Sequence, residues 1–284
     1  MPELPEVETV RRGLVLCLRG ARLLEVSIRR EDLRWPIPAN TIQGLPGCIC
    51  RGIDRRAKYL LLHLDHAEGY SLLIHLGMSG RMVTDGLDDC QAMPEWQTHE
   101  HWRMLWKRQG QPPVLLRFTD PRRFGMLDCT PRANLERHPL LAKLGPEPLG
   151  DRFSPKALFD VTRGRKGCVK GFIMDARRVV GVGNIYASEV CFRAGIRPQK
   201  PVGELRVGDC TRLVETIHTV LTEAIAQGGT TLRDYIGVDA SRGGFQACLR
   251  VYGRAGLACL ACGAIIKKIM LGSRSTFYCP CCQC

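Results

Sequence analysis

The chain of 284 residues is long enough for two domains, and its 45% hydrophobic and 24% charged residues are ordinary for a globular protein. An excess of 41 basic over 28 acidic residues gives a net charge of +13, which favours a polyanionic partner over a neutral one. No apolar run is long enough to cross a bilayer, no basic amphipathic helix suggests a membrane surface, and the charged start with two prolines is unlike a signal peptide.

The first predicted element is a helix over residues 5–18. Pro5 suits its first turn, and Glu6 and Glu8 lie near the positive end of the helix dipole. The apolar residues that recur at helical spacing are Val7, Val10, Leu14 and Leu18. One face of this helix should therefore be buried and hold the amino terminus in place.

Short apolar runs broken by Gly, Pro and Asp follow from about residue 22 to 131. The clearest runs are 24–28, 59–63, 71–75 and 114–118, and they predict strands of a sandwich or barrel. Residues 84–101 are polar and contain Met93-Pro94, His99 and His101, so we expect a surface loop there.

The segment Leu144-Gly-Pro-Glu-Pro148 predicts an interdomain linker, beyond which the apolar spacing becomes helical. Ser154 and Pro155 predict the cap and first turn of one helix. Further helical stretches are 169–175, 185–194 and 210–226.

The tail contains Cys259-x-x-Cys262 and Cys279-x-x-Cys282, a spacing typical of a four-thiolate zinc site. Cys281-x-x-Cys284 has the same spacing, so spacing alone leaves the second pair open. No acidic residue follows Asp239, and the basic residues beyond it are Arg242, Arg250, Arg254, Lys267, Lys268 and Arg274. A small zinc module with this charge is suited to binding phosphate.

The other cysteines of the fifteen are mostly single residues in apolar stretches. Free buried cysteine behaves as a small hydrophobic residue. We therefore expect free thiols and a reducing cytosol rather than disulfides.

The amino terminus predicts a nucleophile. Removal of Met1 would leave Pro2 with a free secondary amine. An α-amino group has a pKa of about 7.7–8.0 against about 10.4 for lysine, so more of it is neutral and nucleophilic at neutral pH. The adjacent Glu3 could transfer protons. Proline is a common second residue, so this hypothesis depends on the other motifs.

Those motifs resemble the bacterial formamidopyrimidine-DNA glycosylase family over nearly the whole chain, starting with Met1-Pro-Glu-Leu-Pro-Glu-Val-Glu-Thr-Val10. The blocks that match in the family's order are Arg55-Arg-Ala-Lys58-Tyr-Leu, His75-Leu-Gly-Met78-Ser-Gly, Asp120-Pro-Arg-Arg-Phe124-Gly, Leu144-Gly-Pro-Glu-Pro-Leu, Val182-Gly-Asn184-Ile-Tyr-Ala-Ser-Glu, Gly228-Gly-Thr-Thr-Leu-Arg-Asp-Tyr and Val251-Tyr-Gly-Arg254. Ala57 departs from the glycine of the family, and Ala258 from its proline.

The resemblance implies an α+β fold with an N-terminal helix on a β-sandwich, a helix–two-turn–helix domain and a C-terminal zinc finger, with DNA in the cleft. The expected boundaries are 1–135 for the catalytic sandwich domain, 136–150 for a linker, 151–245 for the helical DNA-binding domain and 246–284 for the finger. The family's ending favours Cys279 and Cys282 as the second ligand pair, with one structural zinc ion per chain.

The resemblance also implies residue roles. Pro2 would form the Schiff base, Glu3 would be its acid/base partner, and Lys58 and Arg274 would support catalysis at the phosphates. Glu6 would order the amino terminus. Lys58 could instead be an ordinary solvated lysine at a strand end.

Six residues are implied to bind DNA, namely Met78, His99, Arg122, Phe124, Arg165 and Asn184. Met78, Arg122 and Phe124 would fill the space of an extruded nucleotide. The competing interpretations are core packing for Met78 and Phe124, and a helix cap for Asn184. Residues 228–240 resemble the loop that covers the lesion.

The resulting prediction is a bifunctional DNA glycosylase and abasic-site lyase of base excision repair. Its substrate would be double-stranded DNA that contains 8-oxoguanine, a formamidopyrimidine or an abasic site. We expect a monomer in the bacterial cytoplasm. The alternatives are an endonuclease VIII-like enzyme for oxidised pyrimidines and a DNA-damage-binding protein without catalysis.

Overall fold

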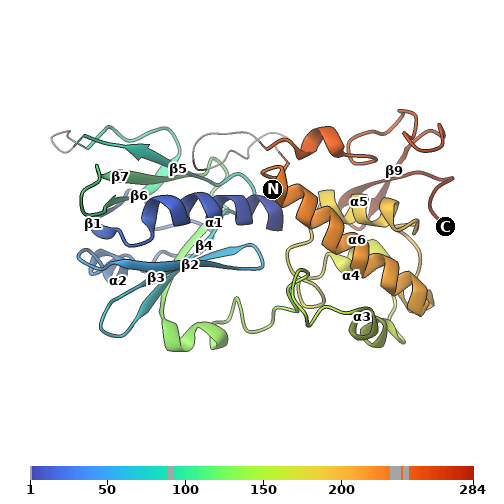
Figure 1. Ribbon diagram of the computed structural model, residues 1–284, viewed down its shortest axis with the longest axis horizontal. Helices are drawn as coiled ribbons and strands as arrows, with labels where there is room; N and C mark the ends of the chain where they lie inside the picture. The colour runs from blue at the N-terminus through green and yellow to red at the C-terminus, as the bar shows by residue number, and fades with distance from the viewer. Residues whose placement is uncertain (1, 89–92, 231–237, 239–242) are drawn as a thin grey trace. The chain divides into compact units, whose positions relative to one another are not determined.

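The structure is a computed structural model that describes residues 2–88, 93–230, 238 and 243–284. The chain divides into two compact units (Figure 1). The first contains residues 1–142 and 228–244, and the second contains residues 143–227 and 245–284.

The first unit begins with α1 (Leu4–Leu18), as predicted, with Pro5 in its first turn. Glu3 is the N-cap residue, and its side chain forms a capping box with Glu6. The helix buries the predicted apolar face against β2 and β3 and the core between the sheets.

Two antiparallel four-stranded sheets form the sandwich, so the predicted class is confirmed. One sheet has the order β1-β6-β7-β5, with bounds β1 (Arg22–Ile28), β5 (Arg81–Gly86), β6 (Glu100–Lys107) and β7 (Val114–Thr119). The other has the order β2-β3-β4-β8, with bounds β2 (Cys50–Arg56), β3 (Tyr59–Leu64), β4 (Tyr70–His75) and β8 (Met126–Pro131). The short elements α2 (Ala39–Gln43) and η1 (Arg132–Arg137) complete this part.

The expected surface loop 84–101 is only partly correct. β5 extends to Gly86, and β6 begins at Glu100. His101 therefore belongs to a strand and is buried, and its Nε2 lies 2.8 Å from the carbonyl oxygen of Asp120. The polar sequence concealed this start, because two buried polar side chains replace the usual apolar ones.

The second unit contains the predicted helices as α3 (Pro155–Thr162), α4 (Val169–Ile173), α5 (Asn184–Arg193) and α6 (Val207–Ala226). Ser154 caps α3 by accepting a hydrogen bond from the Ala157 amide at 3.2 Å. The turns η2 (Val202–Glu204) and η3 (Phe245–Cys248) flank α6 in the chain. No helix among the described residues has the length and apolar character needed to cross a bilayer.

The tail forms an antiparallel hairpin of β9 (Lys267–Leu271) and β10 (Arg274–Tyr278). The buried carboxylate of Glu189 in α5 accepts hydrogen bonds from the amides of Arg250, Val251 and Tyr252. The side chain of Gln283 joins the Cys279 amide to the Ile196 carbonyl oxygen. These buried polar contacts attach the tail to the helices of its own unit.

Candidate DNA-processing site

The Glu6 carboxylate holds the amino-terminal segment. Its Oε2 accepts a hydrogen bond from the Glu3 amide, and its Oε1 accepts one from the Thr230 amide, both at 2.7 Å. Glu3 and Glu6 are each 1% exposed, and Pro2 is buried. Gly229 has φ +81°, and a Cβ there would lie 2.7 Å from Glu6 Oε1. The expectation that Glu6 orders the amino terminus is therefore confirmed.

Lys58 lies in the turn between β2 and β3, directly after Ala57. Ala57 has φ +55°, a conformation that favours glycine, which explains the residue expected there. Burial, followed by the charges of Lys58 and Arg34, lowers the pKa of His75 to about 4. A neutral imidazole therefore stands beside the Lys58 ammonium at neutral pH, although sequence reasoning had assigned His75 no role.

The turn that carries Met78 packs on the loop that carries Phe124. Gly77 has φ +63°, and a Cβ at this position would lie 2.3 Å from the backbone carbon of Phe124. The buried Asp120 accepts hydrogen bonds from Ser79 Oγ at 2.5 Å and from the Gly125 amide at 2.7 Å. Asp120, which the sequence analysis did not single out, thus joins the two turns.

Arg122 and Phe124 project from this loop. Phe124 is 41% exposed, and the Arg122 guanidinium carbon lies 5.0 Å from the centre of its ring. Phe124 is therefore not a core residue, and Met78 is only half-buried. An exposed ring beside a cation is suited to contact nucleobases.

His99 and Arg165 occupy exposed turns in different units. His99 has φ +62°, and its carbonyl oxygen accepts a hydrogen bond from the Asp120 amide at 2.9 Å. Arg165 follows α3, and its backbone packs against Gly203. Both side chains are accessible to a ligand.

Asn184 is the first residue of α5, and Gly183 is its N-cap, so the alternative of a capping asparagine is wrong. The Asn184 amide instead donates to the Ser275 carbonyl oxygen at 3.1 Å. Its Oδ1 accepts from the Lys170 ammonium at 2.6 Å. The start of α5 and the finger hairpin are therefore held together within the second unit.

Lys170 is a residue that sequence reasoning missed. It is 1% exposed, and its ammonium also donates to Thr276 Oγ1 at 2.7 Å and to the Ser275 carbonyl oxygen at 3.2 Å. It thereby connects α4, α5 and β10. A lysine in an apolar helical stretch gave only a weak signal, because lysine is usually solvated.

Arg274 opens β10 beside the Gly272 turn, and its side chain is exposed. It pairs across the hairpin with Leu271. Hydrogen bonds from Lys170 and Asn184 to the next two residues, Ser275 and Thr276, fix the start of β10, so the position of Arg274 is defined relative to α5.

The thiols of Cys259, Cys262, Cys279 and Cys282 all lie within 4.8 Å of one another. The Sγ atoms of Cys262 and Cys279 are 3.5 Å apart, and those of Cys259 and Cys282 are 3.9 Å apart. Tetrahedral zinc with bonds of about 2.3 Å requires sulfur separations of about 3.8 Å. The donor set fits one zinc ion, and the exposed Cys281 and Cys284 lie outside it.

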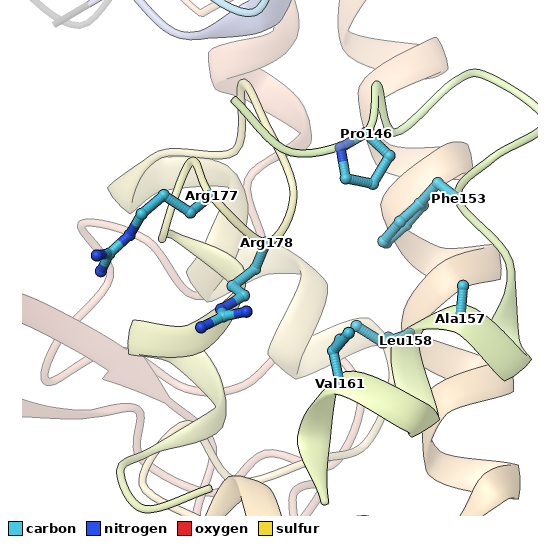
Figure 2. Close-up of a pocket in the computed structure, with 7 residues that line it drawn as sticks. All are labelled: Pro146, Phe153, Ala157, Leu158, Val161, Arg177 and Arg178. Atoms are coloured by element: carbon cyan, nitrogen blue, oxygen red, sulfur yellow. The ribbon is translucent and has the colours of Figure 1, made fainter. Parts of the chain in front are cut away.

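The structure thus places Pro2, Glu3, Lys58, Met78, His99, Arg122 and Phe124 in the first unit and Arg165, Asn184, Arg274 and the four thiols in the second. Most of the expected lesion-covering segment 228–240 lies outside the described residues. A separate hollow of about 210 Å³ in the second unit contains none of these residues. Phe153, Leu158 and Val161 lie on one side of it, across from Arg177 and Arg178 (Figure 2).

Sequence models of known domains cover most of the chain. Residues 1–127 match the formamidopyrimidine-DNA glycosylase N-terminal domain, residues 144–235 match its H2TH domain, and residues 256–283 match the zinc finger found in FPG and IleRS.

Full-length relatives and solved structures agree with these matches. The formamidopyrimidine-DNA glycosylase of Thioalkalivibrio sulfidiphilus is 50% identical, and that of Pseudomonas aeruginosa strain LESB58 is 48% identical, with 100% of each chain covered. The crystal structure of the MutM (Fpg) protein from Thermus thermophilus has a TM-score of 0.85 at 36% identity, covering 99% of this chain and 98% of that one. A Lactococcus lactis Fpg in complex with DNA that contains an abasic site has a TM-score of 0.88 at 31% identity, with 99% of each chain covered.

Proposed function

Because the chain belongs to the formamidopyrimidine-DNA glycosylase family, we propose that it excises oxidised purines from duplex DNA and cuts the strand at the resulting abasic site. It is a DNA glycosylase of base excision repair, and its zinc finger holds one structural ion. We further propose that it acts in the bacterial cytoplasm, where its DNA substrate lies.

The observation that carries the residue assignment is the anchored amino terminus. Glu6 fixes the amide of Glu3, so the nitrogen of Pro2 stands at a defined place rather than on a frayed end. Pro2 is the nucleophile of the proposed reaction. Its neutral amine attacks C1′, and the bond between C1′ and the base breaks with its electron pair leaving on the base, which takes up a proton.

The attached Pro2 nitrogen loses its proton, and the sugar ring then opens at the C1′–O4′ bond, with O4′ taking up a proton. The product is a cationic imine between Pro2 and C1′ of the opened sugar. This cation acidifies C2′, and loss of a C2′ proton expels the 3′ phosphate. A second elimination expels the 5′ phosphate, and hydrolysis of the remaining imine regenerates the amine. Glu3, buried beside Pro2, is the proposed proton carrier. Lys58 and Arg274 are the proposed cations for the departing phosphates.

Met78, Arg122 and Phe124 are proposed to occupy the gap that the extruded nucleotide leaves. Unstacking a base costs a few kcal/mol, and less when the base is damaged. The joint anchoring of both turns by Asp120 supports this role, because side chains that replace a base must be held rigidly.

The proposal is tested by borohydride trapping on a duplex with an abasic site. The protein with Pro2 at its amino terminus, verified by mass spectrometry, should form a covalent adduct. A version with a permanent N-terminal tag should bind the same DNA without forming one. Equal trapping by both would refute the role of Pro2, and no trapping by either would favour a damage-binding protein.

The substrate class is tested with duplexes that contain 8-oxoguanine, a formamidopyrimidine or thymine glycol. We expect faster cleavage of the two purine lesions. One solved Lactococcus lactis Fpg complex contains Fapy-dG, and another contains an oxidised pyrimidine. Cleavage of a duplex therefore does not by itself identify the substrate class, and the rates on purine and pyrimidine lesions must be compared. Faster cleavage of thymine glycol would support the endonuclease VIII-like alternative.

A further inference from the structure

A polar hollow of about 470 Å³ lies in the first unit, lined by Arg29, Arg30 and residues 96–101. It includes His99, for which the family resemblance predicts DNA contact. Its other walls have no role in the function proposed above. The inference below deepens that function and rests on it.

Trp96 forms one wall of this hollow, and two guanidinium groups lie over its ring. The guanidinium carbon of Arg103 is 4.1 Å from the centre of a Trp96 ring, and that of Arg29 is 6.0 Å from it. Arg103 is buried and donates to the Pro94 carbonyl oxygen at 2.6 Å. The buried Arg103 thus holds the indole by a cation–π contact, and the exposed Arg29 lies near the same ring.

Two of the carboxylates near the hollow are already paired. Glu100 Oε2 accepts from Arg117 at 2.9 Å, and Asp32 pairs with Arg30 at 2.8 Å. Among the described residues Arg29 has no carboxylate partner. Its positive charge is therefore available to an anion.

Two buried polar atoms of residues that line the hollow have no hydrogen-bond partner among the described residues. They are Nδ1 of His101 and Oε1 of Glu100, and both residues are at most 4% exposed. Because His101 Nε2 lies against a carbonyl oxygen, it is the donor of that contact, and Nδ1 is the ring nitrogen that lacks a partner. Buried atoms of this kind are normally satisfied by water or a ligand, and protein–DNA interfaces are rich in bridging water.

We propose that Arg29 and Trp96 form an additional contact surface for the DNA backbone outside the lesion. Arg29 binds one phosphate, and the indole of Trp96 packs against the adjoining deoxyribose. The open, mainly polar hollow suits a sugar–phosphate backbone, because a base in a duplex remains stacked within the helix. The surface lengthens the bound stretch of DNA without entering the chemistry at Pro2.

Tryptophan fluorescence gives a direct test. Trp102 and Trp106 are 0% exposed and Trp35 is 51% exposed, so in a Trp35→Phe background Trp96 is the accessible tryptophan among the four of the chain. The probes are duplexes with an uncleavable tetrahydrofuran abasic-site analogue and with short or long flanks on either side. A long flank on one side should change the Trp96 signal, and the short duplex should not.

Binding measured across salt concentrations tests Arg29. Arg29→Ala should weaken binding of the long duplex several-fold and lower its salt slope by about 0.9, the value for one lost phosphate contact. Trp96→Ala should act in the same direction, and Trp96→Phe should retain most of the affinity. Arg51→Ala removes one exposed arginine of β2, outside the hollow, and should leave the slope unchanged.

Borohydride trapping on the short duplex, with a true abasic site, separates this proposal from the function itself. All variants should be trapped at the wild-type rate. An unchanged Trp96 signal and an unchanged slope for Arg29→Ala, with normal trapping, would overturn the additional surface alone. Absence of trapping by the wild-type protein would instead overturn the catalytic assignment.

Discussion

Phe124 and Phe118 show how the surroundings of one residue type determine its role. Phe118 is 0% exposed and stacks on Trp102 with ring centres 5.0 Å apart, whereas Phe124 is 41% exposed beside Arg122. The two positions are separated by a loop that Asp120 holds. Burial stabilises the fold at one position, and exposure leaves a ring available to DNA at the other.

Phe124→Ala should therefore leave the melting temperature nearly unchanged, whereas Phe118→Ala should cost about 3–5 kcal/mol of folding free energy. The Phe124 variant should excise a damaged base more slowly but cleave a preformed abasic site almost normally, because no base needs to be extruded there. A large loss of thermal stability together with equal loss of both reactions would instead show that Phe124 is a packing residue.

His75 makes stability depend on pH. Its pKa falls from 6.5 to about 4, first through burial and then through Lys58 and Arg34, so folding favours the neutral ring. The contribution of the neutral His75 ring to folding stability is complete above pH 6.5. It is lost as the pH falls toward 4, because the unfolded chain binds the proton first. Its upper limit is about 3 kcal/mol.

His75→Gln should flatten the dependence of melting temperature on pH between 6.5 and 4. His63, whose pKa is also lowered mainly by burial, contributes to the pH dependence in the same range. The comparison between variant and wild type should therefore use the slope of melting temperature against pH, not the total change in melting temperature. His218→Gln removes an exposed imidazole of α6 as a control. If melting temperature falls with pH as steeply in the His75 variant as in the wild type, His75 is not a source of the pH dependence.

At the scale of elements, tight turns determine where the side chains proposed to contact DNA lie. The turn with Met78 requires both a positive φ and the absence of a side chain at Gly77. Gly20 also has a positive φ of +80°, but a Cβ at this position would meet no atom within 4 Å. A side chain at Gly20 would therefore cause backbone strain alone, whereas one at Gly77 would cause both backbone strain and steric overlap.

Gly20→Ala should cost about 1–2 kcal/mol, the usual penalty of a left-handed conformation. Gly77→Ala should cost more and should also slow base excision, since its Cβ would displace the backbone at Phe124. Thermal denaturation and single-turnover excision measure the two effects. Equal stability and equal activity of both variants would show that the close approach at Gly77 is unimportant.

The zinc finger depends on its four clustered thiols. Cys279→Ser should release the metal and abolish lesion binding, because so small a hairpin has little core without it. Cys284→Ser should keep one zinc ion per chain, as its thiol lies outside the cluster. Zinc analysis of both purified variants would decide this, and loss of zinc from the Cys284 variant alone would contradict the ligand set.

At the scale of the whole molecule, the chain returns to its first unit after forming most of the second. Residues 228–244 belong with residues 1–142, and Val238 is buried in the sandwich core. A Cβ at Gly13 of α1 would lie 3.1 Å from the Val238 side chain. Completion of the first unit therefore depends on a segment that is distant in sequence.

Val238→Ala should destabilise the protein by roughly 1.5 kcal/mol, from two lost buried carbons at about 0.8 kcal/mol each. Val161→Ala, at a position that is 38% exposed in α3, is the matched control and should change little. Urea denaturation of both variants would measure the difference. Equal midpoints would show that Val238 does not complete the core.

The sequence by itself predicted the main helices, four of the strands and the spacing of the thiolates. The strand runs left a sandwich or a barrel open, and the family motifs favoured the sandwich. Helical spacing, strand runs and cysteine spacing are encoded in neighbouring residues, so they can be read without tertiary contacts. It could also indicate chemistry at Pro2 and Glu3 through the family motifs. The start of β6 was missed, because Glu100 and His101 satisfy their polar groups in the interior through distant partners.

Only the tertiary structure decided which thiols cluster, what Asn184 contacts and which aromatic rings are exposed. Cys279 and Cys281 have the same spacing to a second cysteine, and only the fold places one pair against Cys259 and Cys262. Lys170 gained its importance from acceptors more than a hundred residues away in β10. Such contacts depend on the packing of distant segments, which no local pattern of residues specifies.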